Sequence, residues 1–82
     1  MTPSEAAVYD RYRAAAALGH AAPSMREIAL AVRLNRWWVQ ELVNRLQRAG
    51  HIRRFGRANS FRVEIVATGQ STRPINVVWR GN

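Results

Sequence analysis

The sequence predicts an α+β domain in which three helices precede a β-hairpin. Two segments open with a capping box, and a third opens with an asparagine cap. After each of these starts, apolar residues recur with a helical period, whereas from position 51 onward they alternate with polar residues. The chain has 82 residues, which is enough for one domain and leaves no room for a second core.

The first helix is expected over residues 3–18. Thr2 is placed to cap it, Pro3 suits the first helical position, and Glu5 completes the capping box. Gly19 can end the helix in the left-handed conformation. The apolar stripe at helical spacing consists of Val8, Tyr9, Tyr12, Ala15 and Ala16.

Two further helices follow, separated by the tight turn "RLN". The second is expected over residues 25–32, with Ser24 and Glu27 as its capping box. Asn35 caps the third, and Gly50 stops it. The inward residues of the third helix are expected to be Val39, Leu42, Val43 and Leu46. A short helix, a tight turn and a second helix are typical of a helix-turn-helix.

After the third helix the pattern changes to strand, turn and strand. The strands are expected in "HIRRF" (51–55) and "SFRVEIV" (60–66), with "GRAN" (56–59) as the turn. A helix-turn-helix followed by a hairpin is a winged helix-turn-helix, so this fold is predicted for residues 1–66. Residues 67–82 are interpreted as a C-terminal extension, linker-like over 67–74 and then an extra strand or a dimer contact.

The charge distribution gives the clearest indication of function. The formal net charge is +8, from 13 basic residues, all of them arginine, and 5 acidic residues. Residues 33–62 contain eight arginines and one acid, a net +7. Such asymmetry favours contact with nucleic acid, because the planar guanidinium suits phosphates and guanine edges. A GC-rich genome is an alternative explanation for the exclusive use of arginine.

The same sequence argues against an enzyme. It has no cysteine, His20 and His51 are isolated, and no carboxylate cluster has metal-ligand spacing. We therefore expect no catalytic residue, metal, cofactor or small-molecule ligand. No apolar run approaches the roughly 20 residues that span a bilayer, and the first residues lack the basic segment of a signal peptide. We expect no membrane contact and a cytoplasmic, nucleoid-associated location.

Three segments are similar to a known family. "TPSEAAVYDRYR", "PSMREIALAV" and "LVNRLQRAGHIRR" resemble the DNA-binding domain of the LexA repressors, over residues 2–66. "PSMREIA" is the most specific of these pieces, and the remainder is shared by winged-helix regulators in general, including the MarR type. The resemblance implies a transcriptional regulator of bacterial or phage type, such as a repressor, that binds double-stranded DNA.

Two features depart from the family pattern. The stretch from Leu34 to Gly50 is slightly shorter than in LexA domains and closer to MarR-type spacing, so the target DNA sequence is not carried over. Arg33 stands where a glycine is usual, and a positive φ there would strain it by roughly 1 kcal/mol or more. The self-cleaving Ser-Lys half of LexA is not expected, because these residues include no lysine.

The outward face of the third helix is the predicted DNA-reading surface, because the N-terminal part of such a helix enters the major groove. Arg36 can bind guanine O6 and N7, whereas Gln40 and Asn44 can pair with adenine N6 and N7. Glu41 would repel phosphate, so it should face a cytosine amino group or pair with Arg45. The full set of predicted DNA-binding residues is Arg26, Asn35, Arg36, Trp37, Trp38, Gln40, Glu41, Asn44, Arg45, Arg53, Arg54, Arg57 and Arg62.

Several of these assignments have alternatives. Trp38 can instead pack at the edge of the core against the first helix, and Trp37 can instead lie in a dimer or partner-protein interface. The hairpin arginines can be a merely solvated face. His51 is expected at the surface or on a DNA phosphate.

Two functions follow from this reading. The preferred one is a sequence-specific double-stranded DNA-binding regulator that acts as a homodimer, because one such module buries little surface on DNA. The alternative is a winged helix for protein contact in replication or recombination, with Trp37 and Trp79 against the partner. Only the first requires the +7 charge. A left-handed-nucleic-acid-binding domain fits poorly, because it would need Asn and Tyr at the positions of Gln40 and Asn44.

Overall fold

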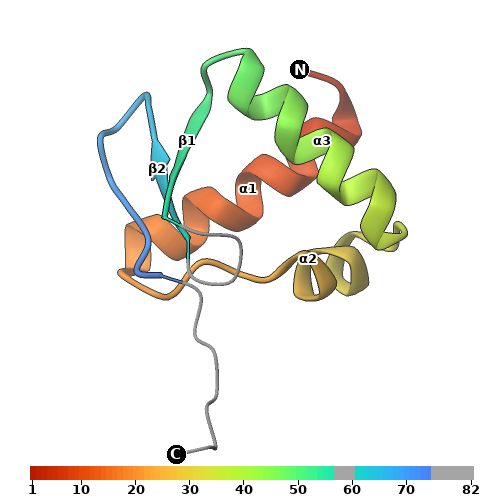
Figure 1. The fold of residues 1–82 in the computed structure, drawn as a ribbon, viewed down its shortest axis with the longest axis horizontal. Coiled ribbons are helices and arrows are strands. Elements are labelled where there is room, and N and C mark those ends of the chain that lie inside the picture. The colour runs from red at the N-terminus through yellow and green to blue at the C-terminus, as the bar shows by residue number, and fades with distance from the viewer. Residues whose placement is uncertain (57–60, 75–82) are drawn as a thin grey trace, which may run out of the picture.

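The computed structural model describes residues 1–56 and 61–74, which form three α-helices and one antiparallel β-hairpin (Figure 1). The α+β class and the order of the elements agree with the sequence prediction, and the helix bounds match it. The elements are α1 (Pro3–Leu18), α2 (Met25–Val32), α3 (Arg36–Arg48), β1 (Ile52–Phe55) and β2 (Arg62–Ile65).

Side-chain caps begin all three helices, as predicted. The Thr2 hydroxyl accepts a hydrogen bond from the Glu5 backbone N–H at 3.1 Å, and the Glu5 carboxylate accepts one from the Thr2 N–H at 2.9 Å. Ser24 and Glu27 form the same box before α2. The Asn35 side chain accepts from the third residue of α3 at 2.7 Å. Each cap satisfies N–H groups that a helix start leaves unpaired.

One apolar core joins the helices to the hairpin. α1 packs against α2, α3 and β2, and α3 also packs against α2 and β1. The predicted inward face of α3 is confirmed, because all four of its residues are buried. The core side chains of α1 and the hairpin include Val8, Tyr12, Ala16, Ile52, Phe61, Val63 and Ile65. The elements on either side of α3 therefore hold the helix in one orientation.

Residues 67–74, linker-like in composition, fold back on the hairpin. The Thr72 N–H donates to the Val63 carbonyl at 2.8 Å, and the Thr72 hydroxyl accepts from the Val63 N–H at 2.9 Å. Arg73 continues to the connection between α1 and α2, where its N–H donates to the His20 carbonyl at 2.9 Å. The free edge of β2 needs hydrogen-bond partners, and this stretch provides them. Residues 75–82, predicted as a strand or contact segment, lie outside the described residues.

Arg33 ends α2 in the left-handed region, at φ 61° and ψ 43°. Among residues 1–56 and 61–74 it is the one non-glycine residue with positive φ. The conformation lets the Arg33 and Leu34 N–H groups both donate to the Ala29 carbonyl and so close the turn into α3. The sequence analysis expected strain if this turn has positive φ, because Arg33 stands where the LexA domains that the sequence resembles usually have glycine.

We predict that Arg33→Gly raises the free energy of unfolding by about 0.5–1 kcal/mol. Glycine removes the left-handed penalty, although its more flexible unfolded chain offsets part of the gain. Denaturant unfolding measures the change. The matched control is Arg11→Gly in the middle of α1, which should lower stability by about 1 kcal/mol. A loss of stability in both variants would contradict the strain at Arg33.

Candidate nucleic-acid interface

The start of α3 presents an arginine and a tryptophan to solvent. Trp37 is 78% exposed, and Arg36 beside it is also exposed. Val39, two residues later, is fully buried, and the Asn35 cap fixes the first turn of α3. Turning α3 to bury Trp37 would therefore expose Val39. The predicted exposure of Trp37 is confirmed. A ring of this size in water is a candidate contact surface.

Trp38 has a different environment from its neighbour. Its ring is partly buried and packs against the core cluster. The Arg45 guanidinium lies 4.9 Å from the ring centroid, which is cation–π distance. This is the core-edge position that the sequence analysis weighed against a DNA contact. The Trp38 ring therefore packs α3 against the edge of the core.

Glu41 pairs with two arginines of its own helix. Its carboxylate lies 3.2 Å from Arg45 Nε and 3.4 Å from Arg48 Nη2. The predicted pairing with Arg45 is confirmed, and Arg48 joins it. The three side chains are between about one third and two thirds exposed, so water screens the pairs and each contributes about 0–1 kcal/mol. The arginines can therefore exchange the carboxylate for a phosphate at little cost.

Arg54 connects the hairpin to α3, a contact that the sequence analysis missed. Its Nε donates to Gln47 Oε1 at 2.6 Å, and its Nη2 donates to Asn44 Oδ1 at 3.1 Å. Gln40 Nε2 donates to the same Asn44 oxygen at 3.2 Å. The signal was present in "IRRF", because alternation places residue 54 on the inner side with the buried Ile52.

The inner position of Arg54 also brings its charge close to α1. Burial raises the pKa of the Tyr12 hydroxyl, and the nearby Arg54 charge opposes that rise in pKa. Within residues 1–56 and 61–74 the buried Tyr12 hydroxyl has no hydrogen-bond partner. The Arg54 guanidinium also lies 5.7 Å from the Phe61 ring centroid. Arg54 is thus half-buried beside groups of α1, α3 and the hairpin, and whether it contacts DNA stays a prediction.

The outer face of the hairpin carries two other predicted arginines. Arg53 Nη1 lies 3.9 Å from Glu64 Oε1, its partner across the strands. The Arg62 guanidinium lies 4.5 Å from the Phe55 ring centroid, and its Nη1 donates to Ser71 at 2.8 Å. Both arginines are exposed, so they can reach a phosphate. Arg57, predicted at the turn, lies outside the described residues.

Two further predicted residues lie at helix N-termini. Arg26 is exposed in the first turn of α2, and Asn35 is exposed at the cap. Figure 1 shows α3 running from the α2 end of the molecule to the start of β1. Its arginines stand at its first residue (Arg36) and in its last turn (Arg45 and Arg48), where the helix leads into the hairpin. His51, expected at the surface, is half-buried instead, with its ring edge-on to Tyr9 at a centroid distance of 6.0 Å.

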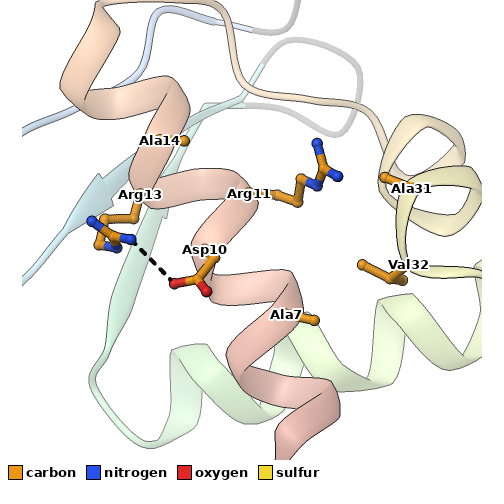
Figure 2. Close-up of a pocket in the computed structure, with 7 residues that line it drawn as sticks. All are labelled: Ala7, Asp10, Arg11, Arg13, Ala14, Ala31 and Val32. Atoms are coloured by element: carbon orange, nitrogen blue, oxygen red, sulfur yellow. Dashed lines mark hydrogen bonds and ion pairs between the residues drawn. The ribbon is translucent and has the colours of Figure 1, made fainter.

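A groove between α1 and α2 is a second surface feature (Figure 2). Its described lining residues come from α1 and α2: Ala7, Asp10, Arg11, Arg13, Ala14, Ala31 and Val32. Arg13 and Asp10 form an ion pair of 3.4 Å at its rim. The groove has a mixed lining of apolar and charged side chains, and Figure 2 shows Arg11 of α1 pointing across it toward α2. The sequence analysis did not single it out.

Other classes of site are not seen in the part of the chain that the structure describes. Residues 1–56 and 61–74 contain no group of three His, Cys, Asp or Glu side chains placed to hold a metal ion. None of the helices there has the length and apolar character needed to cross a membrane. Comparison with known proteins finds no matching family model, no matching curated protein and no matching solved structure.

The two neighbouring tryptophans should differ in their effect on stability. We predict that Trp38→Ala lowers the free energy of unfolding by about 2 kcal/mol, because its ring covers core surface. Trp37→Ala should change it by no more than about 0.5 kcal/mol, because its ring is in water. Thermal melts of the free protein measure both. Equal losses would contradict the different environments of the two rings.

Proposed function

We propose that the chain is a winged helix-turn-helix protein that binds double-stranded DNA sequence-specifically and regulates transcription. The main supporting observation is the exposed pair Arg36 and Trp37 at the start of α3, a helix whose opposite face is buried. In a helix-turn-helix, the N-terminal residues of the second helix contact base edges in the major groove. The resemblance of three segments to LexA domains adds to this proposal.

Each exposed group at the start of α3 has a distinct role in the proposal. Arg36 donates two parallel hydrogen bonds to guanine O6 and N7. Trp37 places its apolar ring against thymine methyl groups and excludes water from that contact. Asn35 and Arg26 are near the N-terminal ends of helices, where positive charge and free N–H groups favour phosphate. These contacts combine base reading with positioning on the backbone.

The hairpin is the proposed wing. Arg53 and Arg62 are exposed on its outer face, where they would contact phosphate or enter the minor groove. The Arg53–Glu64 pair is long, at 3.9 Å, so a phosphate competes easily with the carboxylate. Arg45 and Arg48 extend the basic surface along α3. A single module of this size reads one half-site, so we propose that two copies bind together.

A protein-interaction role is the second candidate. The observation that favours it is the groove between α1 and α2, together with Leu30 of α2, which is 71% exposed. These residues are separate from the basic surface, and a partner there would not require the net charge of +8. The two candidate functions predict different effects of salt and of Trp37 substitution on DNA binding.

DNA binding should weaken steeply as salt rises. If about four to six phosphates are neutralised per protomer, the logarithm of the association constant should fall with the logarithm of salt concentration with a slope near −4 to −5. Fluorescence anisotropy with labelled duplex DNA at several salt concentrations measures the slope. A flat response, with binding retained at high salt, would remove the electrostatic basis of the proposal.

Trp37→Ala and Arg53→Ala should weaken DNA binding in different ways. Trp37→Ala should cost about 1–3 kcal/mol on the preferred site and much less on random DNA, because base contacts specify. Arg53→Ala should weaken binding similarly on every sequence and make the salt slope shallower by about one.

Arg13→Ala is the matched control for Arg53→Ala. Both arginines are exposed and pair with a carboxylate, but Arg13 lies at the α1–α2 groove, so its removal should leave the slope unchanged. If Trp37→Ala binds every DNA as the wild type does, Trp37 belongs to a protein interface instead.

A further inference from the structure

The orientation of the Asn44 side-chain amide is determined by Arg54. A guanidinium has only hydrogen-bond donors, so any amide group that bonds to it must present its oxygen. Arg54 Nη2 lies 3.1 Å from Asn44 Oδ1, and Arg54 Nε lies 2.6 Å from Gln47 Oε1. Rotating the Asn44 amide by half a turn would place its NH₂ group against a cation. The amide oxygen of Asn44 therefore points to the hairpin.

The same oxygen has no capacity left for DNA. A carbonyl oxygen has two lone pairs, and Asn44 Oδ1 accepts from both Arg54 and Gln40, the latter at 3.2 Å. None of the hydrogen bonds among residues 1–56 and 61–74 involves Asn44 Nδ2. Asn44 is half-buried on α3, four residues after Gln40 and on the same side. The Nδ2 group of Asn44 therefore remains as a hydrogen-bond donor toward DNA.

We infer that Asn44 is a donor-only reading group that selects guanine, an inference that rests on the proposed binding of α3 to DNA. Guanine presents two acceptors in the major groove, O6 and N7, to which the two N–H bonds of Nδ2 can donate. Adenine presents N7 beside an amino donor, which would face the Asn44 NH₂ group. The adenine pairing predicted from the sequence needs a free amide oxygen, which Asn44 lacks here.

Gln40 differs from Asn44 in this respect. It uses one Nε2 hydrogen on Asn44 and keeps its own oxygen and its second hydrogen. Gln40 can therefore still make the two-bond contact with adenine. Arg54 acts as a positioning residue, because it sets the polarity of Asn44 from the hairpin without touching the base. The hairpin thus contributes to specificity through α3 as well as through the backbone.

The inference is tested on the DNA site that the wild-type protein enriches from a random pool. Each base pair of that site is replaced in turn, and binding is measured for the wild type, Asn44→Ala and Asn44→Asp. The wild type should prefer guanine over adenine about tenfold at one position, and Asn44→Ala should abolish that preference alone. Asn44→Asp keeps an oxygen toward Arg54 but exchanges the donor for an acceptor, so the preference should move to cytosine, whose amino group donates.

Arg54→Met gives an independent readout, with a thermal melt to confirm that it folds. Without the guanidinium the Asn44 amide is free to turn, so the guanine preference at that position should weaken towards adenine. A general structural role for Arg54 would weaken binding without changing which base is preferred. Asn44→Asp keeps the test decisive if Arg54→Met does not fold.

The outcomes separate this inference from the proposed function. A site at which Asn44→Ala relaxes an adenine position, or relaxes no position, overturns the inference and leaves DNA binding intact. If the random pool yields no preferred site, the proposed function itself fails, and the inference fails with it.

Discussion

The burial of one face of α3 is the constraint on which the rest of the structure depends. Val39, Leu42, Val43 and Leu46 are each no more than 1% exposed, and burying such a side chain fully contributes about 1.5–3 kcal/mol. Rotating α3 by one residue would expose part of this face and bury either Arg36 and Gln40 or Glu41 and Arg45 in its place. The exposed ion pairs of Glu41 are too weak to offset that loss. Core packing therefore decides which side chains of α3 face solvent.

Arg54 adds a second constraint. It fixes the orientation of side-chain amides on α3, whereas the core fixes the rotation of the helix itself. The core leaves Gln40, Asn44 and Gln47 at the surface or half-buried, with amides that could turn either way. The Arg54 guanidinium removes that freedom for Asn44 and Gln47, because it can only donate. The hairpin thereby determines that the Asn44 and Gln47 amides turn their oxygens toward Arg54. A reading surface needs this kind of support, because a side chain held in one state discriminates better than a mobile one.

Features set by neighbouring residues were predictable from the sequence. The capping boxes at Thr2 and Ser24 need partners only three residues away, and the strain at Arg33 followed from one unusual residue. Contacts between distant residues were not predictable. Thr72 bonds to Val63 nine residues earlier only because the edge of β2 is free. The inward position of Arg54 depends on its acceptors on α3, seven and ten residues away. Whether these side chains contact DNA depends on a partner that the fold alone does not specify.

Selection from a random pool of double-stranded oligonucleotides with the purified wild-type protein tests the central claim most directly. We predict an enriched motif with two-fold symmetry, whose half-site centres lie about one helical turn, or roughly 10 base pairs, apart. A pool that remains without an enriched motif at low salt would contradict sequence-specific binding by α3. An enriched but asymmetric short motif, bound by one copy, would contradict only the paired binding.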